Sequence, residues 1–340
     1  MAQSSAVVVC SAARLAGSLM LPFKLIYSDG YYLPIGEHVF PAQKYRLIRE
    51  QLLNTGSAAE SDFLTPQPAR DADILLAHTA EWVSKLTQGT ISPREELMLE
   101  VPYSRELVRA FWLAAGGSIL AAQCALGDRV GVSIGGGFHH AFADHGEGFC
   151  MINDIAVAIR KLQHDGSIAR AMTVDCDVHQ GNGTAAIFGA NNDGAAFSFG
   201  GMGARDFAGL ESDVFTISLH QENNYPAFKP PSSIDVNLAD GVGDAEYLSH
   251  LDRALSAGLH QFDPQLLCYI AGADPYREDQ LGGLSLTIEG LKKRDALVFR
   301  AAKARNIPVM VTFAGGYARQ VEDTVTIHCN TVFAAKEVYS

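Results

Sequence analysis

Short apolar runs alternate with helical patterns along this chain, and that alternation limits the folds it can adopt. Eight runs that are rich in β-branched or aromatic residues and bounded by Gly, Asp or Pro predict strands. They are Phe23–Tyr27, Arg129–Ile134, Ala171–Val178, Ala196–Phe199, Val214–His220, Ile234–Leu238, Leu266–Ala271 and Ile307–Phe313. Seven amphipathic or alanine-rich stretches predict helices, namely Tyr45–Leu53, Asp71–Leu86, Arg105–Leu126, Asp154–Leu162, Glu246–Leu259, Leu286–Arg305 and Val321–Glu337. We therefore expect an α/β fold with a parallel sheet covered on both faces, and ligands at the carboxyl ends of its strands.

Composition excludes several classes of protein. Of the 340 residues, 48% are hydrophobic and 19% charged, which supports a large core and excludes disorder over the whole chain. The net charge of 26 − 38 = −12 and the absence of a basic run predict no direct binding to nucleic acid. A negative surface suits a cationic partner such as a lysine-rich peptide or a polyamine, although solubility alone also explains it. The oligomeric state is not predicted.

The cysteines and the beginning of the chain bear on location. Six scattered cysteines without a CxxC pair favour a reducing, cytoplasmic compartment. No apolar run approaches ~18 residues, so we expect no membrane span. The apolar stretch Ala6–Cys10 lacks a preceding positive charge and matches a secretory signal poorly. Arg14 and the lack of acids before Asp29 resemble an organelle transit peptide, and a misassigned start is the alternative.

The run from Thr173 to Gly183 carries most of the chemistry. Asp175, Asp177 and His179 are spaced by two, and alternate side chains of a strand point to the same face. Two buried carboxylates and an imidazole would repel one another or be costly to desolvate unless a cation lay between them. A surface strand with polar alternation fits poorly, because the preceding residues are apolar. The spacing therefore predicts a site for a divalent metal.

A second apolar strand supplies a third ligand. Asp274 follows the run that begins at Leu266, and by itself it would be a turn or cap residue before a proline. Together with Asp177 and His179 it makes a mixed oxygen and nitrogen set that leaves a position open, as a hydrolytic metal requires. Such a set accepts Zn²⁺ or Fe²⁺.

Acid–base groups follow two further strands. His139 and His140 come after three glycines, and although a single histidine is usually structural, a pair beside a metal site indicates general acid–base catalysis. Asp175 and Asn182 are the local candidates for the groups that orient the two rings. Tyr317 ends another strand; it is either a packed tyrosine or a phenol that donates a hydrogen bond to an oxyanion.

These motifs, in this order, resemble the zinc-dependent histone deacetylase superfamily, from about Phe23 to the end of the chain. The matching pieces are GGGFHHA (135–141), GFCMINDIAVA (148–158), VDCDVHQGNGTA (174–185), FTISLHQENNYP (215–226), DGVGDAEYL (240–248), AGADP (271–275), LTIEGLKKRD (286–295) and AGGYARQVEDTVTIHCNT (314–331). The Gln-Gly-Asn-Gly turn and the compact length are most similar to the bacterial and class IV-type branch. The resemblance implies a single-domain, three-layer arginase/deacetylase fold around an eight-stranded parallel sheet. It divides the chain into a tail (1–20) and a deacetylase catalytic domain (21–340).

The resemblance also implies roles for individual residues. The zinc ligands would be Asp177, His179 and Asp274. The catalytic groups would be His139 backed by Asp175, His140 backed by Asn182, and the transition-state tyrosine Tyr317. The acyl-lysine channel would be formed by Gly148, Phe149, Tyr225, Gly315 and Gly316. A structural potassium ion would bind at Asp175, Asp177, His179, Ser218 and Leu219. His140 would be the principal base and then the acid, while His139 would stay protonated.

Two positions depart from the family pattern. Ala314 replaces the first of three glycines that usually precede the tyrosine, and Glu100 is not a clear match for the rim acid that holds the substrate peptide in some members. The expected reaction is hydrolysis of an N-acyl-lysine or a similar N-acyl amine. The alternatives are an acetylpolyamine or small-metabolite deacetylase, a binuclear manganese ureohydrolase, and a non-catalytic acyl-lysine or polyamine binding module.

Overall fold

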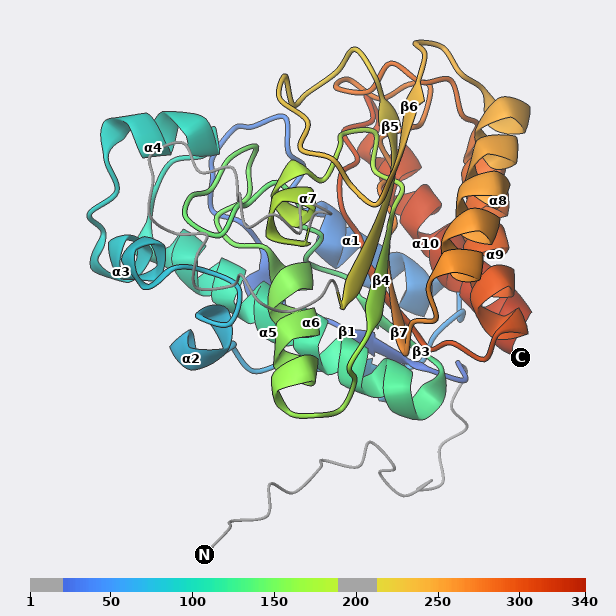
Figure 1. Ribbon diagram of the computed structural model, residues 1–340, viewed down its shortest axis with the longest axis horizontal. Helices are drawn as coiled ribbons and strands as arrows, with labels where there is room; N and C mark the ends of the chain where they lie inside the picture. Colours follow the sequence, from blue (N-terminus) through green and yellow to red (C-terminus); the bar gives the residue numbers. More distant parts are fainter. Residues whose placement is uncertain (1–20, 189–212) are drawn as a thin grey trace, which may run out of the picture.

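An eight-stranded sheet forms the centre of the computed structural model, which describes residues 21–188 and 213–340 (Figure 1). Its strands are β1 (Lys24–Ile26), β2 (Phe63–Leu64), β3 (Val130–Ser133), β4 (Ala171–Asp175), β5 (Val214–Gln221), β6 (Ile234–Leu238), β7 (Leu266–Ile270) and β8 (Val309–Thr312). Their order is β2-β1-β3-β8-β7-β4-β5-β6, and every neighbouring pair is parallel. The parallel sheet expected from the alternating pattern is thereby confirmed.

Helices cover both faces of this sheet. They are α1 (Lys44–Asn54), α2 (Asp71–Ile74), α3 (Ala80–Gln88), α4 (Pro93–Leu99), α5 (Arg105–Asp128), α6 (Asp154–His164), α7 (Asn182–Phe188), α8 (Asp244–Gln261), α9 (Ile288–Ala304) and α10 (Val321–Tyr339), with 3₁₀ turns at Asp29–Tyr31 and Glu60–Asp62. Helices α5 and α6 pack together on one side, while α8, α9 and α10 pack in sequence on the other, with α1 against α10 (Figure 1). The result is the three-layer arrangement of an α/β fold.

Seven of the eight predicted strands are present, and the eighth, Ala196–Phe199, lies outside the described residues. The outer strand β2 was not predicted, because a pair of residues is too short to show a period. The predicted helix Asp71–Leu86 was wrong as one helix, since α2 and α3 are separate. Thr79 begins α3 by accepting a hydrogen bond from the backbone N–H of Trp82, while its own N–H donates to Ala143, and both bonds turn the chain.

Helix α5 has the length and apolar composition of a membrane span, and it is the one such helix among the residues that the structure describes. It packs against β1, β3 and β8 as well as α6, and 72% of its most apolar 18-residue stretch is buried. A Cβ atom at Gly131 of β3 would overlap the carbonyl oxygen of Ala121, so this glycine allows the helix to approach the sheet closely. Packing in the core thus accounts for the composition of α5.

The sheet order places the candidate site. Strands β3, β8, β7 and β4 are neighbours, and their register sets Ser133, Thr312, Ile270 and Asp175 in one row near their carboxyl ends. The loops that follow these strands therefore leave the sheet at the same edge. Each of the loops carries one of the predicted groups, so residues far apart in sequence meet there.

Candidate active site

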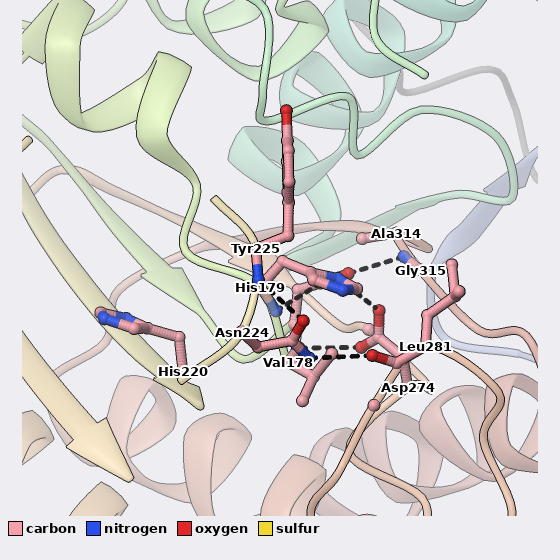
Figure 2. Close-up of polar contacts among 12 residues, drawn as sticks. Val178, His179, His220, Asn224, Tyr225, Asp274, Leu281, Ala314 and Gly315 are labelled. Atoms are coloured by element: carbon pink, nitrogen blue, oxygen red, sulfur yellow. Dashed lines mark hydrogen bonds and ion pairs between the residues drawn. The ribbon is translucent and has the colours of Figure 1, made fainter. Parts of the chain in front are cut away.

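Asp177, His179 and Asp274 form a buried cluster at this edge. One ligand atom from each residue lies within 4.8 Å of the others. The Nδ1 atom of His179 is 3.1 Å from Oδ1 of Asp177 and 3.4 Å from Oδ2 of Asp274 (Figure 2). The backbone N–H of Val178 donates to Oδ1 of Asp274, whereas Oδ2 of Asp274 has no hydrogen-bond partner. The structure thus brings together the three predicted metal ligands.

A turn, rather than strand alternation, creates this convergence. β4 ends at Asp175, so the prediction of a strand to Val178 was wrong at its end. Oδ1 of Asp175 accepts a hydrogen bond from the N–H of Asp177, and Oδ1 of Asp177 accepts one from the N–H of His179. Each carboxylate binds the backbone two residues further on, which replaces sheet pairing by successive turns.

The charges of the cluster fit a divalent cation. Burial, reinforced by the charge of Asp177, raises the pKa of Asp274 to about 7. Burial by itself lowers the pKa of His179, but Asp177 and Asp274 outweigh it and raise that pKa to about 10. Asp177 and Asp274 thus share the single positive charge of His179, and Oδ2 of Asp274 accepts no hydrogen bond. Oxygen and nitrogen donors of this kind are suited to Zn²⁺ or Fe²⁺.

The adjacent histidines have different partners. Nδ1 of His139 is 2.7 Å from Oδ2 of Asp175, and Nδ1 of His140 is 2.7 Å from Oδ1 of Asn182. The two Nε2 atoms lie 3.1 Å apart. Because Oδ1 of Asn182 can only accept, Nδ1 of His140 carries a proton and its Nε2 accepts from Nε2–H of His139.

The pKa values of His139 and His140 are shifted in opposite directions. Burial lowers the pKa of His139, but the charges of Asp175 and Asp177 outweigh it and raise that pKa to about 9. Burial and the positive charge of His139 together hold the pKa of His140 well below its ordinary value. At neutral pH, His139 is therefore a cation and His140 is a neutral base.

Tyr317 stands opposite these groups. Its backbone N–H donates to Oδ2 of Asp279 at 2.7 Å, and its ring lies 6.4 Å from that of His179 between centroids. Burial and the charges of Asp177 and Asp274 raise its pKa well above the ordinary value, so it remains a phenol that can donate. The predicted histidine pair and the predicted phenol donor thus both lie beside the three metal-ligand residues.

A cavity of about 170 Å³ leads to these residues, and it is lined by Glu100, His140, Gly148, Phe149, His179, Asn224, Tyr225, Leu281 and Tyr317. Gly148 and Phe149 both have positive φ angles, 53° and 67°. A Cβ atom at Gly148 would crowd the rings of His140 and Tyr225, so the glycine keeps the wall close to the base. A larger hollow of about 660 Å³ beside α5 contains none of the predicted site residues.

The remaining predicted positions lie around this cavity. The N–H of Gly315 donates to Oδ2 of Asp177 at 2.7 Å, and Gly316 packs against Ala273 and Thr324. Ala314 lines a small void of about 20 Å³ behind the histidines. In the sheet, Asp175 at the end of β4 is paired with Ser218 of β5, and Leu219 follows Ser218 on the same strand. The potassium site at these three residues together with Asp177 and His179 stays a prediction.

Three residues of the site were missed from the sequence. Lys44 is fully buried, and its Nζ donates to the carbonyl oxygen of Ala314 at 2.6 Å. Asp279 holds the backbone of Tyr317. Glu147 accepts hydrogen bonds from Asn182 and from the hydroxyl of Tyr225. Each is a single charged residue outside any spaced motif, so no local pattern marks it.

Comparisons with known proteins agree with this geometry. Residues 38–332 match the family model described as the histone deacetylase domain. The chain is 37% identical to an uncharacterized protein of Picosynechococcus sp. over 93% of this chain and 99% of that one. It is 30% identical to histone deacetylase 2 of Arabidopsis thaliana over 88% and 77%, and 30% identical to the acetoin utilization protein AcuC of Bacillus subtilis over 77% and 69%.

Solved structures show the same fold. A histone deacetylase homologue complexed with SAHA aligns with a TM-score of 0.72 at 23% identity, over 93% of this chain and 84% of that one. The HDA15 HD domain aligns with a TM-score of 0.74 at 22% identity, over 92% and 88%. Since the family model spans most of the chain and carries the motifs that meet at the sheet edge, this chain belongs to the histone deacetylase family.

Proposed function

We propose that this protein hydrolyses the amide of an N-acyl-lysine or a similar N-acyl amine, with Asp177, His179 and Asp274 holding a zinc ion. The observation that carries the proposal is the pair of unlike histidines beside the ligand cluster, at the end of the cavity. A neutral base, a neighbouring cation and a phenol donor around an open metal position are the groups that amide hydrolysis requires.

The roles of the chain's own residues follow from their hydrogen bonds. Zn²⁺, when bound, would polarise the scissile carbonyl and lower the pKa of water at the site. Nε2 of His140 accepts the proton of the attacking water as its oxygen bonds to the carbonyl carbon. The same atom then gives that proton to the amine nitrogen as the carbon–nitrogen bond breaks. The products are a carboxylic acid and a free amine, and transfer of the acid's proton to the amine leaves a carboxylate and an ammonium ion.

The other groups stabilise charge during these steps. His139, held by Asp175, stays an imidazolium and favours the developing negative charge electrostatically. Tyr317 donates its phenol hydrogen bond to the oxyanion of the tetrahedral intermediate. Asn182 keeps His140 oriented throughout, because its Oδ1 accepts from Nδ1–H.

The cavity supports an extended aliphatic arm as substrate. Phe149, Tyr225 and Leu281 line its walls, and the acid Glu100 lies among the lining residues. The net charge of −12 is compatible with a cationic carrier, either a lysine peptide or a polyamine. Fe²⁺ is the alternative metal. Within residues 21–188 and 213–340, the one group of three close metal ligands favours a single ion over a binuclear ureohydrolase site.

A substrate panel tests this proposal. The metal-loaded protein is offered acetyl, butyryl and longer acyl groups on a lysine peptide, on a polyamine and on a small amine, with a hydroxamate inhibitor as control. We expect hydroxamate-sensitive release of a free amine from at least one carrier. If the protein binds these compounds but hydrolyses none of them, the result would favour the non-catalytic binding module instead.

A further inference from the structure

Glu147 lies behind the proposed base without touching it. Its side chain is 18% exposed, and it precedes the cavity-wall residue Gly148. Oε1 accepts a hydrogen bond from Nδ2 of Asn182 and another, at 2.9 Å, from the hydroxyl of Tyr225. Oε2 is 3.8 Å from Nε2 of His145. One carboxylate thus joins the residue that orients the base to the wall of the cavity.

The contact with Asn182 determines which way its amide points. The two ends of an asparagine amide have nearly the same shape, so packing alone does not distinguish them. An ionised carboxylate can only accept hydrogen bonds, and therefore the NH₂ end must face Glu147. The oxygen end then faces Nδ1 of His140, which must carry the proton. Nε2 of His140 then carries the lone pair that a general base needs, and in this structure that lone pair accepts from Nε2–H of His139.

We infer that Glu147 is a positioning residue that fixes the Asn182 amide and, through it, the tautomer of the base His140. The inference rests on the proposed function in that it takes His140 as the base. Of the two side-chain hydrogen bonds of Asn182, only the one to Glu147 selects this orientation of the amide. The bond to His140 could form with either the oxygen or the NH₂ group of the amide, because the imidazole can change tautomer.

Its neighbours keep Glu147 ionised. Burial raises the pKa of Glu147, but the nearby imidazolium of His145 and hydrogen bonds from Asn182 and Tyr225 outweigh it and hold that pKa below the ordinary value. His145 is itself a cation at neutral pH. Burial lowers its pKa, but contacts with Asp144 and Glu147 raise it to about 9. A permanent anion therefore stands one amide away from the histidine that becomes positively charged during the reaction.

The second hydrogen bond extends this control to the cavity wall. The ring of Tyr225 stands edge-on to that of His140, with 4.9 Å between centroids, and its hydroxyl points away from Asp274 (Figure 2). Because the same oxygen of Glu147 accepts from Tyr225 and from Asn182, the wall and the base are fixed relative to one another. Tyr225→Phe removes the hydrogen bond from Tyr225 to Glu147 and leaves the one from Asn182, so the effects of the two bonds can be measured separately.

Kinetics of four variants test the inference. Glu147→Ala should lower kcat about 10- to 100-fold, as loss of an outer hydrogen-bond partner does, with KM within about 3-fold. Tyr225→Phe should mainly change KM. Glu147→Gln keeps the size of the side chain but loses the charge, and it should lower kcat less than Glu147→Ala. The matched control is Glu81→Gln on the exposed surface of α3, which should match the wild type.

A charge exchange distinguishes positioning from packing. In Glu147→Gln combined with Asn182→Asp, the carboxylate faces Nδ1 of His140 directly and residue 147 becomes the amide. We expect kcat to return to within about 3-fold of the wild type. An unchanged kcat in Glu147→Ala, or a double variant no better than its parents, would overturn the inference.

Nitrogen NMR of the zinc-loaded full chain provides a readout that does not depend on turnover. With ¹⁵N-labelled histidine, the His140 signals are identified by their absence in His140→Ala. The wild type should show a protonated Nδ1 and an unprotonated Nε2, and Glu147→Ala should show both tautomers. A single unchanged tautomer in Glu147→Ala contradicts the inference even if the wild type hydrolyses no substrate of the panel, which would instead contradict the proposed function.

Discussion

His139 and His140 are neighbours in the sequence and yet behave as different chemical groups. A carboxylate stands behind the first and an amide behind the second. The carboxylate of Asp175 stabilises an imidazolium, whereas Asn182 offers only a neutral acceptor, and the nearby positive charge of His139 disfavours a second proton. At the scale of residues, the partner of each ring together with the positive charge of His139 thus distinguishes the two histidines.

Tyr317→Phe removes one hydroxyl from the site. Because Tyr317 is the proposed oxyanion donor, we expect kcat to fall by about 10²- to 10³-fold. The backbone bond to Asp279 remains, so zinc content and unfolding temperature should equal those of the wild type. Steady-state kinetics and elemental analysis check both points, and wild-type turnover by this variant would remove Tyr317 from the mechanism.

Asp274→Ala removes a proposed metal ligand whose Oδ2 accepts no hydrogen bond in the structure. The purified variant should bind less than a tenth of the zinc held by the wild type after dialysis, since the remaining donors are one carboxylate and one imidazole. Elemental analysis measures the zinc. Asp263→Ala is the control, because the Asp263 side chain is 90% exposed. Equal zinc in Asp274→Ala and in the wild type would refute ligation by Asp274.

Helix α5 shows how single glycines set the distance between elements. Its length and its capping Ser104 are local properties, since the hydroxyl accepts a hydrogen bond from Leu107 N–H in the first turn. Its depth in the fold is not local. A side chain at Gly116 would overlap the carbonyl oxygen of Gln67, and one at Gly117 would overlap the hydroxyl of Tyr31.

Gly116→Ala sets two effects against one another. Helix propensity favours alanine over glycine by about 1 kcal/mol. The new methyl group, however, would overlap a backbone carbonyl, and overpacking of this kind costs about 1–3 kcal/mol or more. We expect the free energy of unfolding in urea to fall. Gln123→Ala, at an exposed position of α5, should stay within about 0.5 kcal/mol of the wild type. A stabilised Gly116→Ala would mean that the backbone shifts freely.

At the scale of the whole molecule, the sheet order decides which residues meet. β3, β8, β7 and β4 are adjacent although they are far apart along the chain, and the turns after them carry the histidine pair, Tyr317, Asp274 and Asp177. The same assembly buries several histidines away from the site. One of them, His78, accepts a hydrogen bond from the backbone N–H of Asn153 at 2.9 Å.

His78 makes the stability of the whole fold depend on pH. Burial lowers its pKa from 6.5 to about 4, so the unfolded chain binds this proton first as the pH falls. Its contribution to stability is complete above pH 6.5 and is lost between pH 6.5 and 4. At pH 5 this amounts to about 2 kcal/mol of unfolding free energy relative to pH 7.5.

Urea unfolding at pH 7.5 and pH 5 measures this effect. His78→Gln cannot titrate, so its free energy of unfolding should fall less between the two pH values than that of the wild type. His164→Gln should behave like the wild type, because the His164 side chain is 67% exposed. If wild type and His78→Gln lose the same stability, the acid sensitivity has another origin.

The sequence by itself determined the class of fold and the groups of the candidate site. Strand periodicity and helical patterns are local properties, and so seven predicted strands and most predicted helices are present. The spacing around Asp177 and His179, with Asp274 after a second strand, predicted the cluster that forms. The short β2 and the break between α2 and α3 were not predictable, because each depends on contacts with distant backbone.

Only the tertiary structure decided which hydrogen-bond partner each residue of the site has. Lys44 reaches Ala314 across 270 positions of the chain, and Glu147 meets Asn182 at the start of α7 and Tyr225 in the loop after β5. A charged side chain has no preferred partner until the fold excludes water around it, because only then does an unpaired charge become costly. The sequence therefore names the donors and bases, while the packed structure sets their protonation.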